Sequence, residues 1–489
     1  MNTGTGQVTA TESDISSVLR ICLHKLGISF LIFDGLDECL DWKGLVTSIC
    51  EATVGTQCKI ILITRPHLAL SENFGHDLYH INLDVLSNHD DIRLFLLPEV
   101  DALRGHIAGH QSEPEIVNEI TNRANSMFLW AKLMVRYLQS PTLTPQERLE
   151  AICDMNLLEG LDKLYMRILE NVREHLPQRQ WIKVQKIFQW IAVASYPLLT
   201  PELQIALAVQ QSRGATKDDL IPDFEASLVQ ICGAFVEIKE DLTVHFIHLS
   251  VLEFLTDRAP GMCSPYVSNS PFHVDLCSAS FFAATTCLRY IIYDVPHKPL
   301  RGSSSTTGET QTIELRYPFL KYASQCWPWH TREGISLFCN GAAPKPNESI
   351  ASHLEALYMM FSIKEIVTLW IEASYTFGFP PSLLDLPFQM TRLKIPRLTA
   401  ETSLVSEKLK TLSTCLLELH QHWLNVLFEN PSEIWLPSIN AFMKSECLIG
   451  TTEAKIHILA SVDDDAILIA SQESSNGKEI GMIKVWPSR

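Results

Sequence analysis

One stretch near the amino terminus constrains the fold more than any other, residues 29–38 with the sequence SFLIFDGLDE. A short apolar run that ends at polar residues predicts a strand buried on both faces, as in a parallel sheet. Open α/β sheets bind ligands at the carboxyl ends of their strands. We therefore expect Asp34 at the strand tip, with Asp37 and Glu38 just beyond it, close enough to share a metal-bound water. The alternative is a strand that ends in a solvated acidic turn.

A helix and a second strand follow this stretch. Residues 42–52 predict the helix, and residues 59–64 (KIILIT) predict a second buried strand that ends at Thr64 and Arg65. Two strands joined by one helix make a βαβ unit, in which the strands are parallel. A further helix is expected before the first strand, over residues 14–26, and Gly27 ends it.

Charge and composition exclude several classes of protein. The formal net charge of −17 argues against a protein whose main partner is nucleic acid. No run of about 18 apolar residues predicts a membrane span, and the polar residues 1–14 do not form a signal peptide. The 13 cysteines show no CxxC spacing, which favours reduced thiols over a zinc site or a disulfide framework. These features indicate a cytoplasmic globular protein, without membrane or nucleic-acid binding.

The rest of the chain is predicted to be mostly helical. Residues 161–260 show helices followed by a hairpin, with strands at 235–238 and 243–247, which is the order of a winged helix. Residues 456–460, 466–471 and 481–486 predict strands, and Asn476-Gly477 is a strong hairpin signal. The expected fold class is mixed α/β and then mostly α, ending in a short β-hairpin region.

Several motifs carry a resemblance to a known family. Residues 31–39 (LIFDGLDEC) resemble the extended Walker B motif of NACHT-type nucleoside triphosphatases, especially fungal ones. Residues 59–66 (KIILITRP) are similar to their sensor 1 strand, and residues 125–131 (NSMFLWA) resemble the helix after their core. The resemblance covers most of the chain. It implies a partial P-loop-type parallel sheet and a signalling protein of the fungal heterokaryon-incompatibility or innate-defence kind.

The resemblance also implies a nucleotide site. In this family ATP or GTP binds with Mg²⁺, which would assign Asp34 to the metal and Asp37 and Glu38 to hydrolysis. Thr64 and Arg65 would face the γ-phosphate side. In related switch ATPases a winged-helix histidine contacts the β-phosphate, a position that His248 matches. The alternative for His248 is a structural histidine that is hydrogen-bonded within the winged-helix module.

One part of this site is missing from the sequence. Phosphate binding requires a GxxxxGK[ST] loop between a strand and a helix, and none precedes Asp34. At the other end, residues 481–486 (GMIKVW) resemble one strand of a WD40 blade. We therefore expect a chain that is shortened at both ends, cannot hydrolyse ATP or GTP by itself, and lacks part of the site that would bind either nucleotide. It would act through protein partners, full-length homologues among them. The alternatives are a Mg²⁺-dependent NTPase whose phosphate contacts come from an unrecognised or missing segment, and a metal-dependent hydrolase.

The expected division has five parts. Residues 1–105 form the partial NACHT core and 106–160 a helical connector. Residues 161–260 form the winged helix, 261–450 a helical extension, and 451–489 the incipient WD40-like strands.

Overall fold

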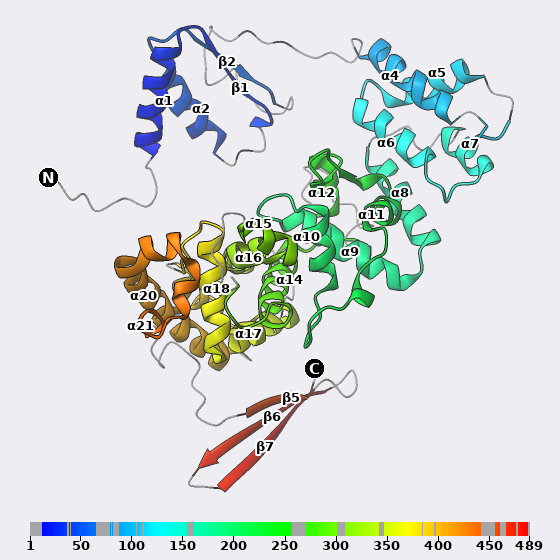
Figure 1. The fold of residues 1–489 in the computed structure, drawn as a ribbon. Coiled ribbons are helices and arrows are strands. Elements are labelled where there is room, and N and C mark those ends of the chain that lie inside the picture. The colour runs from blue at the N-terminus through cyan, green and yellow to red at the C-terminus, as the bar shows by residue number, and fades with distance from the viewer. Residues whose placement is uncertain are drawn as a thin grey trace. The chain divides into compact units, whose positions relative to one another are not determined.

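The computed structural model describes residues 12–36, 39, 41–64, 79, 81, 88–103, 105–109, 112–153, 161–256, 270–300, 309–341, 347–383, 385–395, 398–441, 455–459, 466–475 and 478–487. The chain divides into two compact units, Met1–Asp84 and Val85–Arg489. Among the described residues most are helical, and the strands form small sheets of two, two and three strands (Figure 1). The predicted predominance of helix is confirmed. The division into five parts stays a prediction.

The described residues of the first unit form two helices and a pair of strands. Its elements are α1 (Glu12–Leu26), β1 (Ser29–Phe33), α2 (Trp42–Thr53) and β2 (Cys58–Leu62). The strands pair in parallel, with Phe33 opposite Leu62, as the βαβ pattern predicted. Gly27 separates α1 from β1 at a φ of 67°, a left-handed conformation that glycine adopts without strain.

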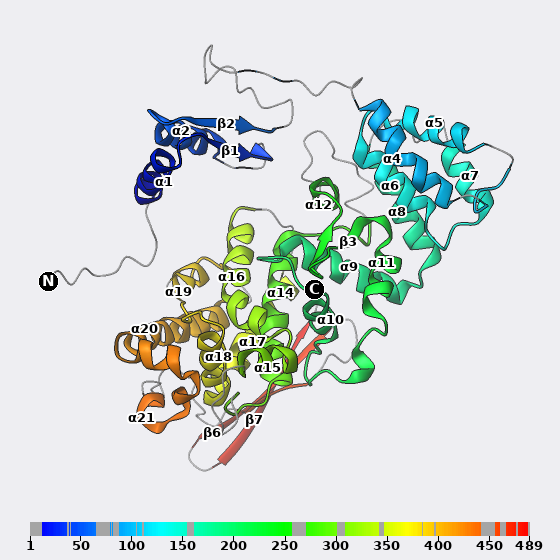
Figure 2. The same cartoon turned by 45° about the horizontal axis from the view of Figure 1, so that its top comes forward.

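The faces of this sheet differ from the prediction. Leu31 and Phe33 are partly buried, whereas Phe30 and Ile32 are exposed, and β2 alternates in the same way. The expectation of strands buried on both faces was therefore wrong for the described structure. The reason is that α1 and α2 lie on the same side of the two strands (Figures 1 and 2).

The first described elements of the second unit are four helices. They are α4 (His89–Ala102), α5 (Glu113–Ala124), α6 (Phe128–Leu138) and α7 (Pro145–Cys153). Asn125 and Ser126 both have positive φ and separate α5 from α6. Two cations on α6 bind one carboxylate of the following module: Lys132 Nζ and Arg136 Nη2 lie 3.2 and 3.3 Å from Glu237 Oε2. These contacts attach α6 to the hairpin that comes later in the chain.

A winged-helix arrangement follows, as predicted. Its elements are α8 (Leu161–His175), α9 (Gln178–Val193), α10 (Thr200–Ala208), the 3-10 helix η4 (Lys217–Asp219), α11 (Phe224–Cys232), the 3-10 helix η5 (Gly233–Phe235), β3 (Val236–Ile238), β4 (Val244–Phe246) and α12 (Leu249–Leu255). The strands β3 and β4 form an antiparallel hairpin with Glu237 opposite His245. We call this hairpin the wing.

Helices continue after the winged helix and share its hydrophobic core. They are α14 (Leu276–Arg289), the π-helix η6 (Tyr290–Asp294), α15 (Glu309–Arg316), α16 (Leu320–Cys339), α17 (Asn347–Ser362), α18 (Lys364–Thr376), α19 (Leu386–Met390), α20 (Thr399–Glu429), the 3-10 helix η7 (Pro431–Trp435) and α21 (Pro437–Asn440). One cluster of buried side chains extends from Ile92 to Ile439. Trp190 of α9 lies in it and contacts the rings of Phe282 on α14 and Tyr322 on α16.

One stretch of this core is unusually apolar. Among the described residues, Leu276–Asp294 alone is long and apolar enough to cross a membrane by length and composition, with a mean hydropathy of 1.2. Inside the protein 72% of this stretch is buried. The helix α14 packs against α9, α16 and α17. Burial among neighbouring helices accounts for its apolar composition, since helices in protein cores share that composition.

The last described elements form a three-stranded antiparallel sheet. Its strands are β5 (Lys455–Leu459), β6 (Ala466–Ser475) and β7 (Lys478–Pro487), in the order β5-β6-β7. All three were predicted from their apolar runs. Their likeness to a WD40 blade stays a prediction, and Asn476-Gly477 lies outside the described residues.

The carboxyl group of Glu202 makes the stability of the winged helix depend on pH. Glu202 accepts a hydrogen bond from the backbone N–H of Leu199 at 2.8 Å, at the start of α10. Burial raises the pKa of Glu202 from 4.5 to about 6. The folded state therefore binds this proton more tightly, and the stabilisation is full below pH 4.5 and is lost as pH rises through about 6. The difference corresponds to about 2 kcal/mol.

The variant Glu202→Gln tests this dependence. Glutamine still accepts the Leu199 hydrogen bond but never ionises. We expect the variant to have a higher free energy of unfolding than the wild type at about pH 8, and an equal one at about pH 4. Urea denaturation at both pH values measures the difference. Glu240→Gln, at an exposed site in the wing, is the matched control and should change neither value. A difference for Glu202→Gln that is the same at both pH values would contradict the assignment.

Candidate functional site

The structure places Asp34 and Thr64 at the same edge of the parallel sheet. Asp34 follows β1 directly, and Thr64 follows β2 by two residues. The pairing continues past the strands, because Ile63 N–H donates to Phe33 O at 2.8 Å and Leu36 N–H donates to Ile63 O at 3.1 Å. Asp34 is exposed. Its carboxylate therefore lies at the carboxyl edge that the sequence predicted.

The other residues predicted for this edge are not placed. Asp37, Glu38 and Arg65 lie outside the described residues, so their roles stay predictions. Among the described residues no group of three or more His, Cys, Asp or Glu side chains lies together as a metal site. Asp34 offers one carboxylate, and a magnesium ion shared with phosphates and waters takes one or two carboxylates from a protein. Asp34 thus supplies one ligand for a metal ion at this edge of the sheet.

The helix that follows β1 does not offer an open phosphate site. Phosphate groups bind at helix amino termini because the first backbone N–H groups there lack partners. In α2 the carboxylate of Asp41 occupies this position and accepts a hydrogen bond from Gly44 N–H at 3.0 Å. A phosphate would have to displace a carboxylate of the chain itself. The described residues of this edge therefore fit a metal ligand better than a phosphate cradle.

His248, in the second unit, begins helix α12. Its Nδ1 accepts a hydrogen bond from Ser250 N–H at 3.1 Å, so the neutral ring carries its proton on Nε2. Ser250 Oγ lies 2.7 Å from the same Nδ1 and 2.8 Å from the hydroxyl of Tyr165. Because Nδ1 of His248 is an acceptor, the Ser250 hydroxyl donates to it. The Tyr165 hydroxyl then donates to Ser250 Oγ. Burial raises the pKa of Tyr165 to about 12. His248 thus caps the start of α12 by hydrogen bonds within the winged-helix module, which is the alternative to a phosphate contact.

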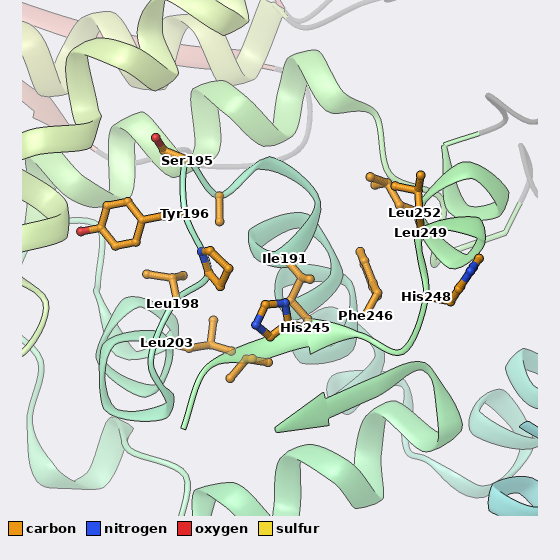
Figure 3. A pocket seen from close by; sticks show the side chains of 13 residues that line it. Ile191, Ser195, Tyr196, Leu198, Leu203, His245, Phe246, His248, Leu249 and Leu252 are labelled. Carbon is orange, nitrogen blue, oxygen red and sulfur yellow. The ribbon is translucent and has the colours of Figure 1, made fainter. Parts of the chain in front are cut away.

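A pocket of about 310 Å³ opens beside the wing (Figure 3). Apolar side chains from α9, the following turn, α10, β4 and α12 line much of it. In Figure 3 the ring of His245 lies between Leu203 and Ile191, whereas His248 lies at the far end beside Leu249.

His245 is the polar side chain at the centre of this pocket. Its Nε2 lies 2.8 Å from Thr243 Oγ1, and the Thr243 hydroxyl donates in turn to Asp241. Burial lowers the pKa of His245, and the charge of Lys239 lowers it further. A neutral ring at physiological pH keeps the pocket uncharged, which suits an apolar side chain of a ligand.

The tip of the wing carries exposed apolar side chains in an unusual conformation. Leu242 has a φ of 65° and is 45% exposed, and Leu199 beside it is 40% exposed. Thr200 N–H donates to Leu242 O at 2.9 Å, which fixes the two segments together. A large side chain at positive φ is strained, and such strain concentrates at functional positions.

Neither Leu199 nor Leu242 was predicted from the sequence as a functional residue. The available signal was a leucine within the turn Glu240-Asp241-Leu242, where polar residues and glycine are the usual choice.

The comparisons with known proteins agree with the described wing and its helices. Residues 171–266 match the family model for the winged helix domain of GPI inositol-deacylase. The match includes α9 to α12 and both strands of the wing. No curated protein and no solved structure matches the chain. Over these residues the chain is similar to that winged helix domain.

Proposed function

We propose that this chain is a NACHT-type regulatory protein that acts by binding other proteins through its winged-helix module. The observation that carries the proposal is the wing tip, where Leu242 is held at positive φ beside exposed Leu199. The neutral, mostly apolar pocket around His245 lies next to it, since Val244 N–H donates to Leu198 O and both residues line the pocket. A partner segment with apolar side chains fits this surface.

Nucleic acid is a poor partner for the same module. Winged helices that bind DNA insert the helix before the wing into the major groove. Here that helix is α11, whose sequence FEASLVQIC contains one glutamate and neither lysine nor arginine. Phosphate backbones require positive charge, and the whole chain has a net charge of −17. A protein partner is therefore favoured.

The finer parts of the proposal rest on the sequence motifs. They are a fungal source, a role in incompatibility or innate-defence signalling, a cytoplasmic location and WD40-like strands at the end. On these motifs the chain lacks the phosphate loop, and full-length homologues are among its partners. Nucleotide exchange would then be the task of those homologues.

Affinity purification with the full chain tests the role of the wing. We compare wild type with Leu242→Asn, because asparagine tolerates positive φ and removes the apolar side chain. The proteins captured by wild type should be lost with Leu242→Asn. Val229→Asn, at an exposed apolar position of α11, is the matched control and should capture them as wild type does. Capture that is unchanged in Leu242→Asn, or no capture at all by wild type, would overturn the proposal.

A second candidate function is a Mg²⁺-dependent nucleotide switch. The observation that favours it is Asp34 beside Thr64 at one edge of a parallel sheet. Labelled ATP and GTP, with and without Mg²⁺, test it on wild type and Asp34→Ala. We expect no Mg²⁺-dependent binding, because no GxxxxGK[ST] loop precedes Asp34 in the sequence and Asp41 occupies the start of α2. Binding that requires Mg²⁺ and is abolished in Asp34→Ala would establish the switch instead.

A further inference from the structure

Among the described residues, one face of the β1–β2 sheet is an exposed apolar surface. Phe30 and Ile32 of β1 are 58% and 63% exposed, and Ile61 and Ile63 are 43% and 45% exposed. Ile32 lies opposite Ile61 in the parallel register, so the four side chains form one patch. We call this patch, together with Lys59 and Asp34 at its ends, the bare face. It belongs to the first unit, outside the winged helix on which the proposed function rests.

The exposed apolar side chains of this face favour a partner that covers them. Parallel sheets occur almost always with both faces covered. Few apolar side chains are fully buried among the described residues of this unit: Leu23, Leu36, Val46, Ile49 and Ala52. The exposed side chains of the bare face are the ones that a partner would cover.

The charges on the bare face indicate what kind of partner fits. Lys59 lies opposite Phe30 near the start of β1, with its Nζ 5.8 Å from the centre of that ring. Asp34 lies at the other end, where the alternation of β1 continues past Ile32, and it is exposed. The face thus has a cation at one end, a carboxylate at the other and apolar side chains between them.

A surface with this pattern is complementary to itself. When two such faces stack about a two-fold axis with their strands running in opposite directions, each Lys59 meets the Asp34 of the other copy. We propose that the bare face binds a second copy of this chain in this way. The patch is small, so the dimer is weak and depends on protein concentration. Its ion pairs are at the rim, so salt weakens it further.

Sedimentation of the full chain over a range of concentrations tests the dimer. Wild type should associate reversibly, and Ile32→Thr, which keeps a β-branched side chain on the strand, should raise the dissociation constant about tenfold or more. Val54→Thr is the matched control, because Val54 is also exposed and apolar but lies after α2, outside the bare face. Wild type that stays monomeric at all concentrations, or a dimer unchanged in Ile32→Thr, would overturn the proposal.

Charge reversal separates a second copy from any other occupant. Lys59→Glu alone and Asp34→Lys alone each place like charges across the two-fold axis, so each should be monomeric. An equimolar mixture of the two variants restores both contacts, because the carboxylate introduced in one chain meets the ammonium introduced in the other, and the unchanged Asp34 meets the unchanged Lys59. The mixture should therefore dimerise about as tightly as wild type. If the mixture stays monomeric while wild type dimerises, the self-complementary arrangement is wrong. The readout is association, so the result is independent of nucleotide binding at Asp34 and of partner capture by the wing.

Discussion

Arg148→Ala will lower the free energy of unfolding of the second unit by about 3–5 kcal/mol. The side chain of Arg148 on α7 is buried, with 8% of the residue exposed. Its guanidinium donates to three backbone carbonyls: Nε to Leu138 O at 2.6 Å, Nη2 to Ser140 O at 2.8 Å and Nη1 to His106 O at 3.1 Å. Leu138 ends α6, where the last carbonyls lack partners within the helix. Alanine would leave these acceptors without their donor and would open a cavity.

Two variants sharpen this test. Arg148→Lys retains the charge but lacks the planar set of donors that reaches three carbonyls, so its loss should be intermediate. Arg93→Ala removes an exposed arginine of α4 and should change stability by less than about 0.5 kcal/mol. Denaturant unfolding of all three variants gives the comparison. A loss for Arg148→Ala no larger than that for Arg93→Ala would show that the three hydrogen bonds do not stabilise the fold.

The elements that the sequence predicted well depend on local patterns. A helix over residues 42–52 was expected, and α2 is Trp42–Thr53. A hairpin at 235–238 and 243–247 was expected, and its strands are Val236–Ile238 and Val244–Phe246. Helical and strand periodicities and the residues that begin and end an element are local, so neighbouring residues suffice to specify them.

The features that were missed depend on residues far apart in the chain. The apolar side chains of Ile32 and Ile61 predict burial, although both are exposed. The sequence of a strand does not reveal whether a helix covers each of its faces. Arg148 reaches carbonyls from two different segments, which no spacing in the sequence reveals. At the candidate site, the βαβ pattern placed Asp34 correctly at a strand end. It could not show that Asp41 occupies the start of the next helix.

Trp190→Ala will destabilise the winged helix and the following helices together, by about 3–5 kcal/mol. Trp190 is fully buried on α9, and its ring contacts Phe282 of α14 and Phe319 and Tyr322 next to and on α16, with centroids 5.6–6.0 Å apart. The same hydrophobic cluster continues on both sides of it. If this core unfolds as one cooperative unit, the variant should shift a single transition in circular dichroism and in tryptophan fluorescence to the same lower temperature.

Matched variants separate the contribution of the aromatic ring of Trp190 to stability from that of its Nε1–H group. The Nε1 of Trp190 is buried without a hydrogen-bond partner among the described residues, so Trp190→Phe removes an unsatisfied donor while keeping an aromatic ring. Its cost should therefore be well below that of alanine. Trp329→Ala, at a partly exposed tryptophan of α16, should also cost less. Two separate transitions in Trp190→Ala, with only one of them shifted, would contradict a shared core. The winged helix would then be an independent domain, and a partner bound at its wing could not be sensed by the helices that follow through their common packing.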